Sequence, residues 1–299
     1  MRRQLAPALI LIAAVTSAAA TPVVSPRQLD TVRIEELTGA KGKLDEKEGV
    51  FKVSMPRGDL DVKVAGVRMT PPMGLTSWAS FKRVGQHTVA MGDMVLLEDQ
   101  VNPVMSTALD NGLEVTALHN HFLWDTPKVM FMHIGGMGSE ETLAEAVGKV
   151  FTKIKDTGGG KGETPHAEID PAKSSLDPAK IEAVLHLKGD LNNGVYKVVV
   201  GRTARMHGGV MGNTMGVNTW AAFAGSDSQA VVDGDFAVLE TELQPVLKAL
   251  RGAGINIVAI HQHMIGEVPR VMFLHYWGTG SVDALASGLR TALDRTGSR

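Results

Sequence analysis

Histidines recur at a fixed spacing in two parts of this 299-residue sequence. In each part, one residue separates two histidines and a third follows further along. The six are His119, His121, His133, His261, His263 and His275. In a β-strand, residues i and i+2 point to the same side, so each close pair presents two imidazoles from one face. Imidazole is the commonest metal ligand, and catalytic zinc sites typically have three protein ligands and one open position. The spacing therefore predicts a metal site in each part, with zinc favoured.

Several residues can supply the third ligand of each predicted site. The candidates are His133 and His275, Glu98 and Glu240, and the acidic pair Asp125 and Glu267. If residues 122–127 form a tight hairpin, His133 lies opposite residue 116, roughly 10 Å along the strand from His119. One ion would then not reach all three histidines. If the strand ending at Glu98 runs parallel to the strand ending at His133, these two residues form a separate pair at one sheet edge.

Glu98 and Glu240 are the candidate general bases, because each follows a long apolar segment. A partly buried carboxylate at such a place can have a raised pKa and accept a proton. The alternative role is to stabilise the start of the following helix, where negative charge is favourable.

Trp78 and Trp220 stand in a repeated aromatic element of a sequence with few aromatic residues. They are candidate substrate-binding residues, together with Asp125 and Glu267, and core packing is the alternative for both tryptophans. Methionines flank His133, which raises copper as a second possible metal. Met132 is replaced by Leu274 in the second part, however, and this favours core packing for the thioethers.

The two histidine sets belong to an internal repeat. A shift of 142 superimposes residues 73–151 on 215–293 without a gap, and a shift of 147 matches the segments upstream. We therefore expect a first repeat over 29–151 and a second over 176–298. Residues 152–175, which contain three consecutive glycines, read as a flexible linker.

Hydrophobic periodicity gives the same element order in both repeats. Strands are expected at 49–53, 115–121 and 128–134, helices at 102–109 and from Ser139, and an apolar segment at 88–97. This order predicts an α+β fold with two tandem ferredoxin-like repeats about a pseudo-twofold axis, in which antiparallel or mixed sheets carry helices on one face. A bicupin is a minority alternative, since the His-x-His spacing with a following acid also suits a cupin.

Residues 1–20 have the pattern of a signal peptide, with Arg2 and Arg3 before an apolar run and small residues up to Ala20. Removing these two arginines changes the formal charge from −2 to −4, which disfavours nucleic acid as a partner. The apolar run is shorter than the roughly 20 residues of a membrane span, and no later segment is long enough without charge. Cysteine is absent, so neither disulfides nor a lipid-modified cysteine can form. We expect a periplasmic or secreted bacterial protein.

Three segments carry a resemblance to a known family. They are GVRMTPPMGLTSWASF (66–81), MGDMVLLEDQVNPVMSTALDNGLEVTALHNHF (91–122) and PKVMFMHIGGMG (127–138). The chain resembles the LppY/LpqO family, a bacterial domain of unknown function. The resemblance implies an exported envelope protein and supplies no catalytic residues.

These observations favour an exported metal-binding protein. One form of this hypothesis is a zinc-dependent hydrolase in which the ion activates water and Glu98 or Glu240 moves protons. One alternative is a non-enzymatic protein that binds a small-molecule or envelope ligand without a metal. Another is a structural envelope protein whose repeats duplicate a stable core.

Overall fold

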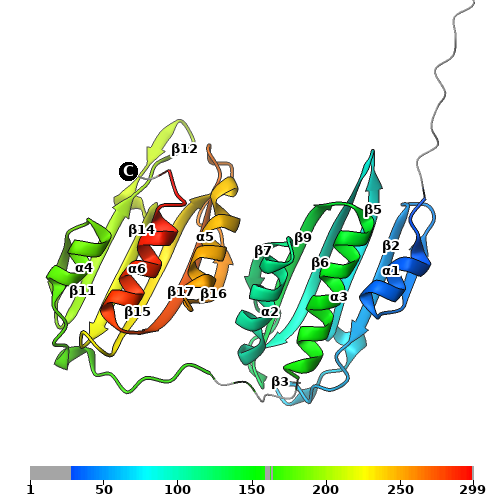
Figure 1. The fold of residues 1–299 in the computed structure, drawn as a ribbon, viewed down its shortest axis with the longest axis horizontal. Coiled ribbons are helices and arrows are strands. Elements are labelled where there is room, and N and C mark those ends of the chain that lie inside the picture. Colours follow the sequence, from blue (N-terminus) through cyan, green and yellow to red (C-terminus); the bar gives the residue numbers. More distant parts are fainter. Residues whose placement is uncertain (1–27, 159–161, 163, 298–299) are drawn as a thin grey trace, which may run out of the picture.

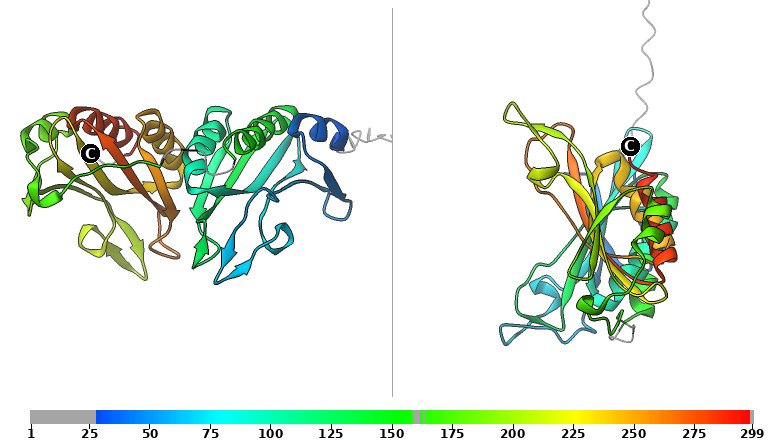
Figure 2. Two further views of the ribbon diagram at one scale, coloured as in Figure 1. Left: turned by 90° about the horizontal axis from the view of Figure 1, so that it is seen from below. Right: turned by 90° about the vertical axis from the view of Figure 1, so that its left-hand side faces the viewer.

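The computed structural model describes residues 28–158, 162 and 164–297. The predicted signal peptide lies outside these residues. Within them, helices and one large sheet form two layers, and all six α-helices cover the same face of the sheet (Figures 1 and 2). No helix among the described residues is long and apolar enough to cross a membrane.

The repeats have matching element orders. The first contains α1 (Thr31–Thr38), β1 (Gly42–Asp45), β2 (Val50–Pro56), β3 (Lys63–Val64), β4 (Val67–Arg68), β5 (Thr76–Val84), β6 (His87–Leu97), α2 (Glu98–Asp110), β7 (Glu114–His119), β8 (Asp125–Thr126), β9 (Val129–Gly138) and α3 (Glu140–Asp156). The second contains α4 (Pro178–Leu185), β10 (Gly189–Asn192), β11 (Val195–Gly201), β12 (Ala204–Met206), β13 (Gly209–Met211), β14 (Asn218–Gly225), β15 (Ala230–Leu239), α5 (Glu240–Gly252), β16 (Asn256–His261), β17 (Val271–Gly280) and α6 (Val282–Leu293). Helix α3 thus extends into the segment predicted as linker.

The large sheet is antiparallel throughout, with the order β1-β2-β5-β6-β9-β7-β16-β17-β15-β14-β11-β10. The α/β repeats, the antiparallel sheet and the single helical layer match the prediction. In a ferredoxin-like sandwich, the first strand has the fourth strand as its outer neighbour, and this fourth strand follows the second helix in the chain. Here that place beside β6 belongs to β5, which precedes β6 in the chain, and β1, β2 and α1 extend the repeat further.

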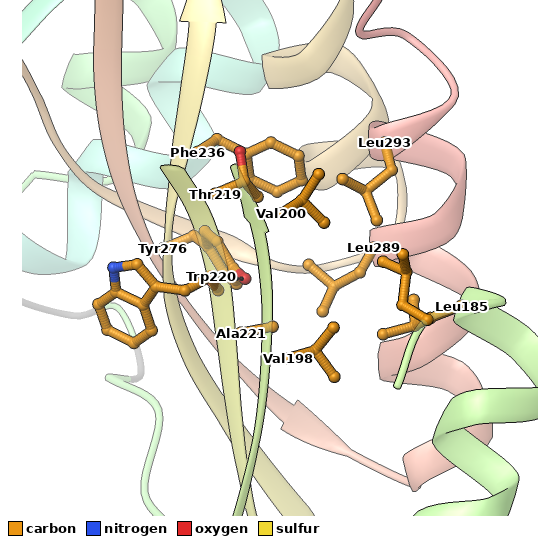
Figure 3. A pocket seen from close by; sticks show the side chains of 11 residues that line it. Leu185, Val198, Val200, Thr219, Trp220, Ala221, Phe236, Tyr276, Leu289 and Leu293 are labelled. Carbon is orange, nitrogen blue, oxygen red and sulfur yellow. Dashed lines mark hydrogen bonds between the residues drawn. The ribbon is translucent and has the colours of Figure 1, made fainter. Parts of the chain in front are cut away.

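Side chains alternate in direction along each strand, so the sheet has two different faces. Phe51, Val53, Ala79 and Phe81 point toward the helices and join the main core. Residues of the opposite parity point to the other face, which we call the open face. In Figure 3, the core side chains of the second repeat lie on the helical side of β14, whereas the indole of Trp220 points away from them. The remaining cavity among these core residues is about 10 Å³, room for no more than one water molecule.

Loops fold over one end of the open face in each repeat. We call residues 57–75 with 120–128 the first overhang, and residues 201–217 with 262–270 the second overhang. Each overhang buries a small apolar cluster against the sheet, with Leu60, Val62 and Phe131 in the first and Val217, Met264 and Phe273 in the second. The overhangs therefore fix the segments that follow β7 and β16.

Corresponding residues meet where the repeats join. Leu118 in β7 pairs with Ile260 in β16, its counterpart under the shift of 142. The Asn102 amide hydrogen-bonds both backbone groups of Ile257, at 2.8 and 3.2 Å. Its counterpart Gln244 bonds both backbone groups of Val115, each at 2.9 Å. This reciprocity is the relation expected about a local pseudo-twofold axis.

We predict that Asn102→Ala and Gln244→Ala each lower the free energy of unfolding by about 1–3 kcal/mol, because each leaves a backbone N–H and C=O without a partner. Urea denaturation measures this effect. Thr241→Ala, at an exposed position of α5, is the matched control. Equal stability of all three variants would contradict the conclusion that the two amides stabilise the contact between the repeats.

Candidate metal centre

Strand register brings two histidines of the first repeat to the same region of the open face. His119, the last residue of β7, lies opposite Phe131 in β9, and His133 lies two residues beyond Phe131 on the same face. The two imidazole centroids are 5.1 Å apart. His121 lies just beyond β7 and stacks on Phe131, with 3.4 Å between centroids and 6° between planes. One ligand atom from each of the three histidines can be chosen so that all lie within 4.8 Å of one another.

The alternative in which His133 lies apart from His119 and His121 is therefore wrong. A bulge between Val115 and Ala117 places His133 opposite Ala117 rather than residue 116. The offset along the strand falls from three residues to two, or from roughly 10 Å to roughly 7 Å. Two imidazole side chains can span this shorter offset.

The second repeat brings the equivalent histidines together, but the closest group differs. His261 lies opposite Phe273, and His263 stacks on Phe273 with 3.5 Å between ring centroids. His261 and His275 are parallel rings 4.9 Å apart, and the Nε2 atoms of His261 and His263 are separated by 3.0 Å. Here the group within 4.8 Å consists of Asp235, His261 and His263, while His275 Nδ1 lies 3.3 Å from the Gly234 carbonyl oxygen.

A buried aspartate lies beside the histidines in each repeat, and sequence reasoning did not select it. Asp93 in β6 lies directly opposite His133, and Asp235 in β15 lies directly opposite His275. Their Oδ2 atoms are 3.9 and 3.7 Å from Nε2 of His121 and His263, respectively. Both aspartates are buried, and the other carboxylate oxygen of each has no hydrogen-bond partner. A buried carboxylate oxygen without a partner is costly unless something else binds it.

Burial favours the neutral form of three imidazoles, those of His121, His261 and His263. The pKa of His261 is lowered to about 4, chiefly by burial and further by the nearby His263 and His275. Burial also lowers the pKa of His121 and of His263. In the same environment the pKa of Asp235 is raised to about 6, mainly by burial, although the nearby His275 opposes this rise. At neutral pH each of these imidazoles therefore has one unprotonated nitrogen, and the Asp235 carboxylate is negatively charged.

The predicted general bases lie elsewhere. Strands β6 and β9 are antiparallel, so the expected meeting of Glu98 and His133 is wrong, and Leu97 at the end of β6 pairs with Val129. Glu98 and Glu240 are exposed first residues of α2 and α5, and Glu240 lies 3.8 Å from Arg270. Neither glutamate belongs to the potential metal groups found among the described residues.

Asp125 and Glu267 lie in the turns of the two overhangs. The Asp125 carboxylate accepts hydrogen bonds from Val129 N at 2.8 Å and Lys128 Nζ at 3.2 Å. Burial alone would raise the pKa of Asp125, but these bonds outweigh it and the pKa is lowered. Glu267 accepts the equivalent bond from Val271 N at 3.1 Å. Both carboxylates thus hold the turn that precedes a central strand.

The tryptophans lie on the open face next to the centres. Trp78 pairs with Asp93 across β5 and β6, and Trp220 pairs with Asp235 across β14 and β15. In both repeats a lysine ammonium lies over the indole, Lys52 at 3.8 Å and Lys197 at 4.2 Å from the ring centroid. Each centre is therefore flanked by an aromatic surface that carries a positive charge.

Comparison with known proteins identifies the repeat unit. No curated protein matches the chain at a significant level. A trimeric bacterial microcompartment shell protein, PduB, aligns over 85% of this chain and 89% of its own with 10% identity, but the TM-score is only 0.19. Residues 32–153 and 179–295 each match the family described as Domain of Unknown Function (DUF1259). The chain therefore belongs to this family and contains its domain twice.

Proposed function

We propose that each repeat binds one divalent transition-metal ion, with zinc favoured, through three histidines and one aspartate. The first set is Asp93, His119, His121 and His133, and the second is Asp235, His261, His263 and His275. The convergence of imidazoles from separate strand segments beside a buried, unpartnered carboxylate oxygen carries the proposal. A bound cation would satisfy this oxygen and use the neutral imidazoles.

The ligand set suits zinc and does not suit copper in its lower oxidation state. Imidazole and carboxylate are common zinc ligands, whereas thioethers select copper in its lower oxidation state. Met130 and Met132 pack toward the helical core, on the side of β9 opposite to His133. Met137 shares the parity of His133 but lies four residues further along the strand and is exposed. The neighbouring thioethers thus add little support for a copper site.

Hydrolysis is the reaction we propose for these centres. An ion held on the open face has a side toward solvent, where water can complete its coordination and become more acidic. Lys52 beside Trp78, and Lys197 beside Trp220, offer a cation and a ring face to an adjacent substrate. The predicted signal peptide and the resemblance to the LppY/LpqO family support action in the bacterial envelope, on a small-molecule or envelope ligand.

Metal analysis of protein purified without a histidine tag tests the proposal. We expect about two zinc ions per chain, with about one lost in His121→Ala, one in His263→Ala and both in the double variant. His87→Gln is the matched control, because His87 is exposed and the second repeat has Gln229 at this position. Metal-free protein whose thermal stability does not change with chelator would refute metal binding.

An activity assay distinguishes a hydrolase from a protein that only binds metal. Zinc-loaded protein is expected to cleave a chromogenic carboxylate or phosphate ester, and the His121→Ala/His263→Ala double variant is expected not to. The Lys–Trp pairs also suit ligand binding without metal. This alternative predicts metal-free protein whose tryptophan fluorescence changes on adding an envelope ligand, equally in wild type and in the double variant.

A further inference from the structure

Large apolar side chains are exposed at the tips of both overhangs. Trp124 is 77% exposed and Ile265 is 82% exposed, in the loops that follow the histidine pairs. The complete set is Val67, Met73, Leu123 and Trp124 in the first overhang and Val210, Met215, Ile265 and Val268 in the second. Single exposed apolar residues are ordinary on protein surfaces, but groups of them mark interaction sites.

The two overhangs share part of this apolar character at corresponding positions. Leu123 corresponds to Ile265, and Met73 to Met215, under the shift of 142. Val67 and Val210 lie in the corresponding hairpins β3-β4 and β12-β13. Trp124 and Val268 correspond to Gly266 and Thr126, so each tip obtains part of its exposed apolar surface at a different position. Core packing does not require apolar residues at these exposed positions, and their presence in both overhangs indicates a role outside the fold.

The two overhangs project from the same face of the molecule. In Figure 2, the β3-β4 and β12-β13 hairpins both extend away from the sheet on the side opposite the helices, at separate places along it. A flat surface placed against the open face can therefore meet both overhangs at once. A bilayer has this shape, whereas a single peptide would have to bridge the separated tips.

The charge of the two overhangs favours an anionic partner surface. The two overhangs contain seven basic and four acidic residues, although the whole chain has a net charge of −2. Lys63, Arg68, Arg205 and Arg270 are exposed beside the apolar tips. Arg57, Asp125 and Glu267 are buried, and Arg202 pairs with Glu242, so they do not contribute to this surface. The four exposed cations therefore outnumber the two exposed acids, Asp59 and Asp61.

We propose that the tips of both overhangs insert into the interfacial region of an anionic lipid bilayer and hold the open face toward it. Apolar side chains with neighbouring cations are the combination that binds such surfaces, through buried apolar area and attraction to anionic headgroups. Trp124 is suited to this depth because its indole has an apolar body and a polar N–H. The binding does not require a metal.

Co-sedimentation with vesicles of phosphatidylethanolamine and phosphatidylglycerol tests the proposal. We expect the full chain to bind, with affinity reduced about ten-fold or more by Leu123→Ser/Trp124→Ser and similarly by Ile265→Ser/Val268→Ser. Val32→Ser/Val84→Ser is the matched control, because both valines are exposed outside the overhangs. Binding should weaken on pure phosphatidylcholine vesicles and at high salt.

Fluorescence gives a second readout. Trp124 emission, taken as the difference between wild type and Trp124→Phe, should shift to the blue on adding anionic vesicles. Absence of vesicle binding, or equal losses in the tip and control variants, would overturn the proposal. Repeating the measurement in chelator keeps this test separate from the metal proposal, since vesicle binding should persist there.

Discussion

Asp235→Asn is expected to stabilise the metal-free protein at pH 7 by about 1–3 kcal/mol, while weakening metal binding by the second repeat. Burial raises the pKa of Asp235 to about 6 from an ordinary value of 3.8. Each pKa unit corresponds to about 1.4 kcal/mol, so the charged form is disfavoured by at most about 3 kcal/mol. Asparagine has a similar shape without the charge.

The stability difference between Asp235→Asn and the wild type should depend on pH, and the pKa shift of Asp235 gives its sign. Because the folded-state pKa of Asp235 exceeds its unfolded value, its proton stabilises the native state fully below about pH 4, and this contribution is lost as pH rises through 6. The advantage of Asp235→Asn should therefore be full above pH 6 and vanish below about pH 4. His261 has the opposite shift and destabilises the fold as pH falls from 6.5 toward 4, but it does so in both proteins.

Urea denaturation in chelator, repeated over this pH range, measures the difference. Asp233→Asn is the matched control, because Asp233 is exposed two residues earlier on β15 and its replacement should change stability by less than about 0.5 kcal/mol. Metal titration should show an affinity lowered about 10-fold to 100-fold or more in Asp235→Asn. A destabilised metal-free Asp235→Asn protein would instead assign the carboxylate a purely structural role.

Gly234→Ala is expected to destabilise the protein by about 2–4 kcal/mol. A Cβ atom at Gly234 would overlap the Tyr276 ring and hydroxyl and the Trp220 carbonyl oxygen. The Tyr276 hydroxyl donates a hydrogen bond of 2.9 Å to that carbonyl, so the ring has little freedom to move aside. The same change would disturb β15 next to Asp235, and metal binding should weaken with stability.

The first repeat supplies the control for this glycine. At the equivalent Gly92, the nearest atoms to a Cβ are the Trp78 carbonyl oxygen at 2.7 Å, Ile134 Cγ1 at 3.0 Å and Met94 Cε at 3.1 Å. Two of these are atoms of flexible side chains, so Gly92→Ala should cost less. Tyr276→Ile, which copies Ile134, should recover part of the stability lost in Gly234→Ala. Thermal unfolding of all variants measures the series, and equal losses at both glycines would contradict the role of Tyr276.

The sequence predicted those features that depend on local periodicity. The repeat, the amphipathic helix that became α3 and the shared face of each histidine pair all follow from spacing alone. Helix α1 was missed, because only Ile34 and Thr38 of its eight residues are buried and its apolar pattern is weak. Strand β5 is not predicted either, since Trp78 is interpreted only as a substrate-binding or core residue.

The rest of the centre depends on how distant strands pair. The bulge at Val115 brings His133 within reach of His119, and the β6–β9 register places Asp93 opposite His133. The repeat alignment already showed Asp93 and Asp235 at matching positions inside apolar segments. A buried acid kept in both copies was the available signal, but without the register it could not be assigned to the histidines.

The contact between the repeats is formed by equivalent surfaces of both. Leu118 pairs with its own counterpart, and the amide hydrogen bonds of Asn102 are matched by those of Gln244. Interfaces of this isologous kind also form between identical subunits. A chain with one repeat would present the same strand edge to a second copy and assemble as a homodimer. Fusion makes that association intramolecular and independent of concentration. It also lets the halves acquire separate substitutions, as at Gly135 and Trp277.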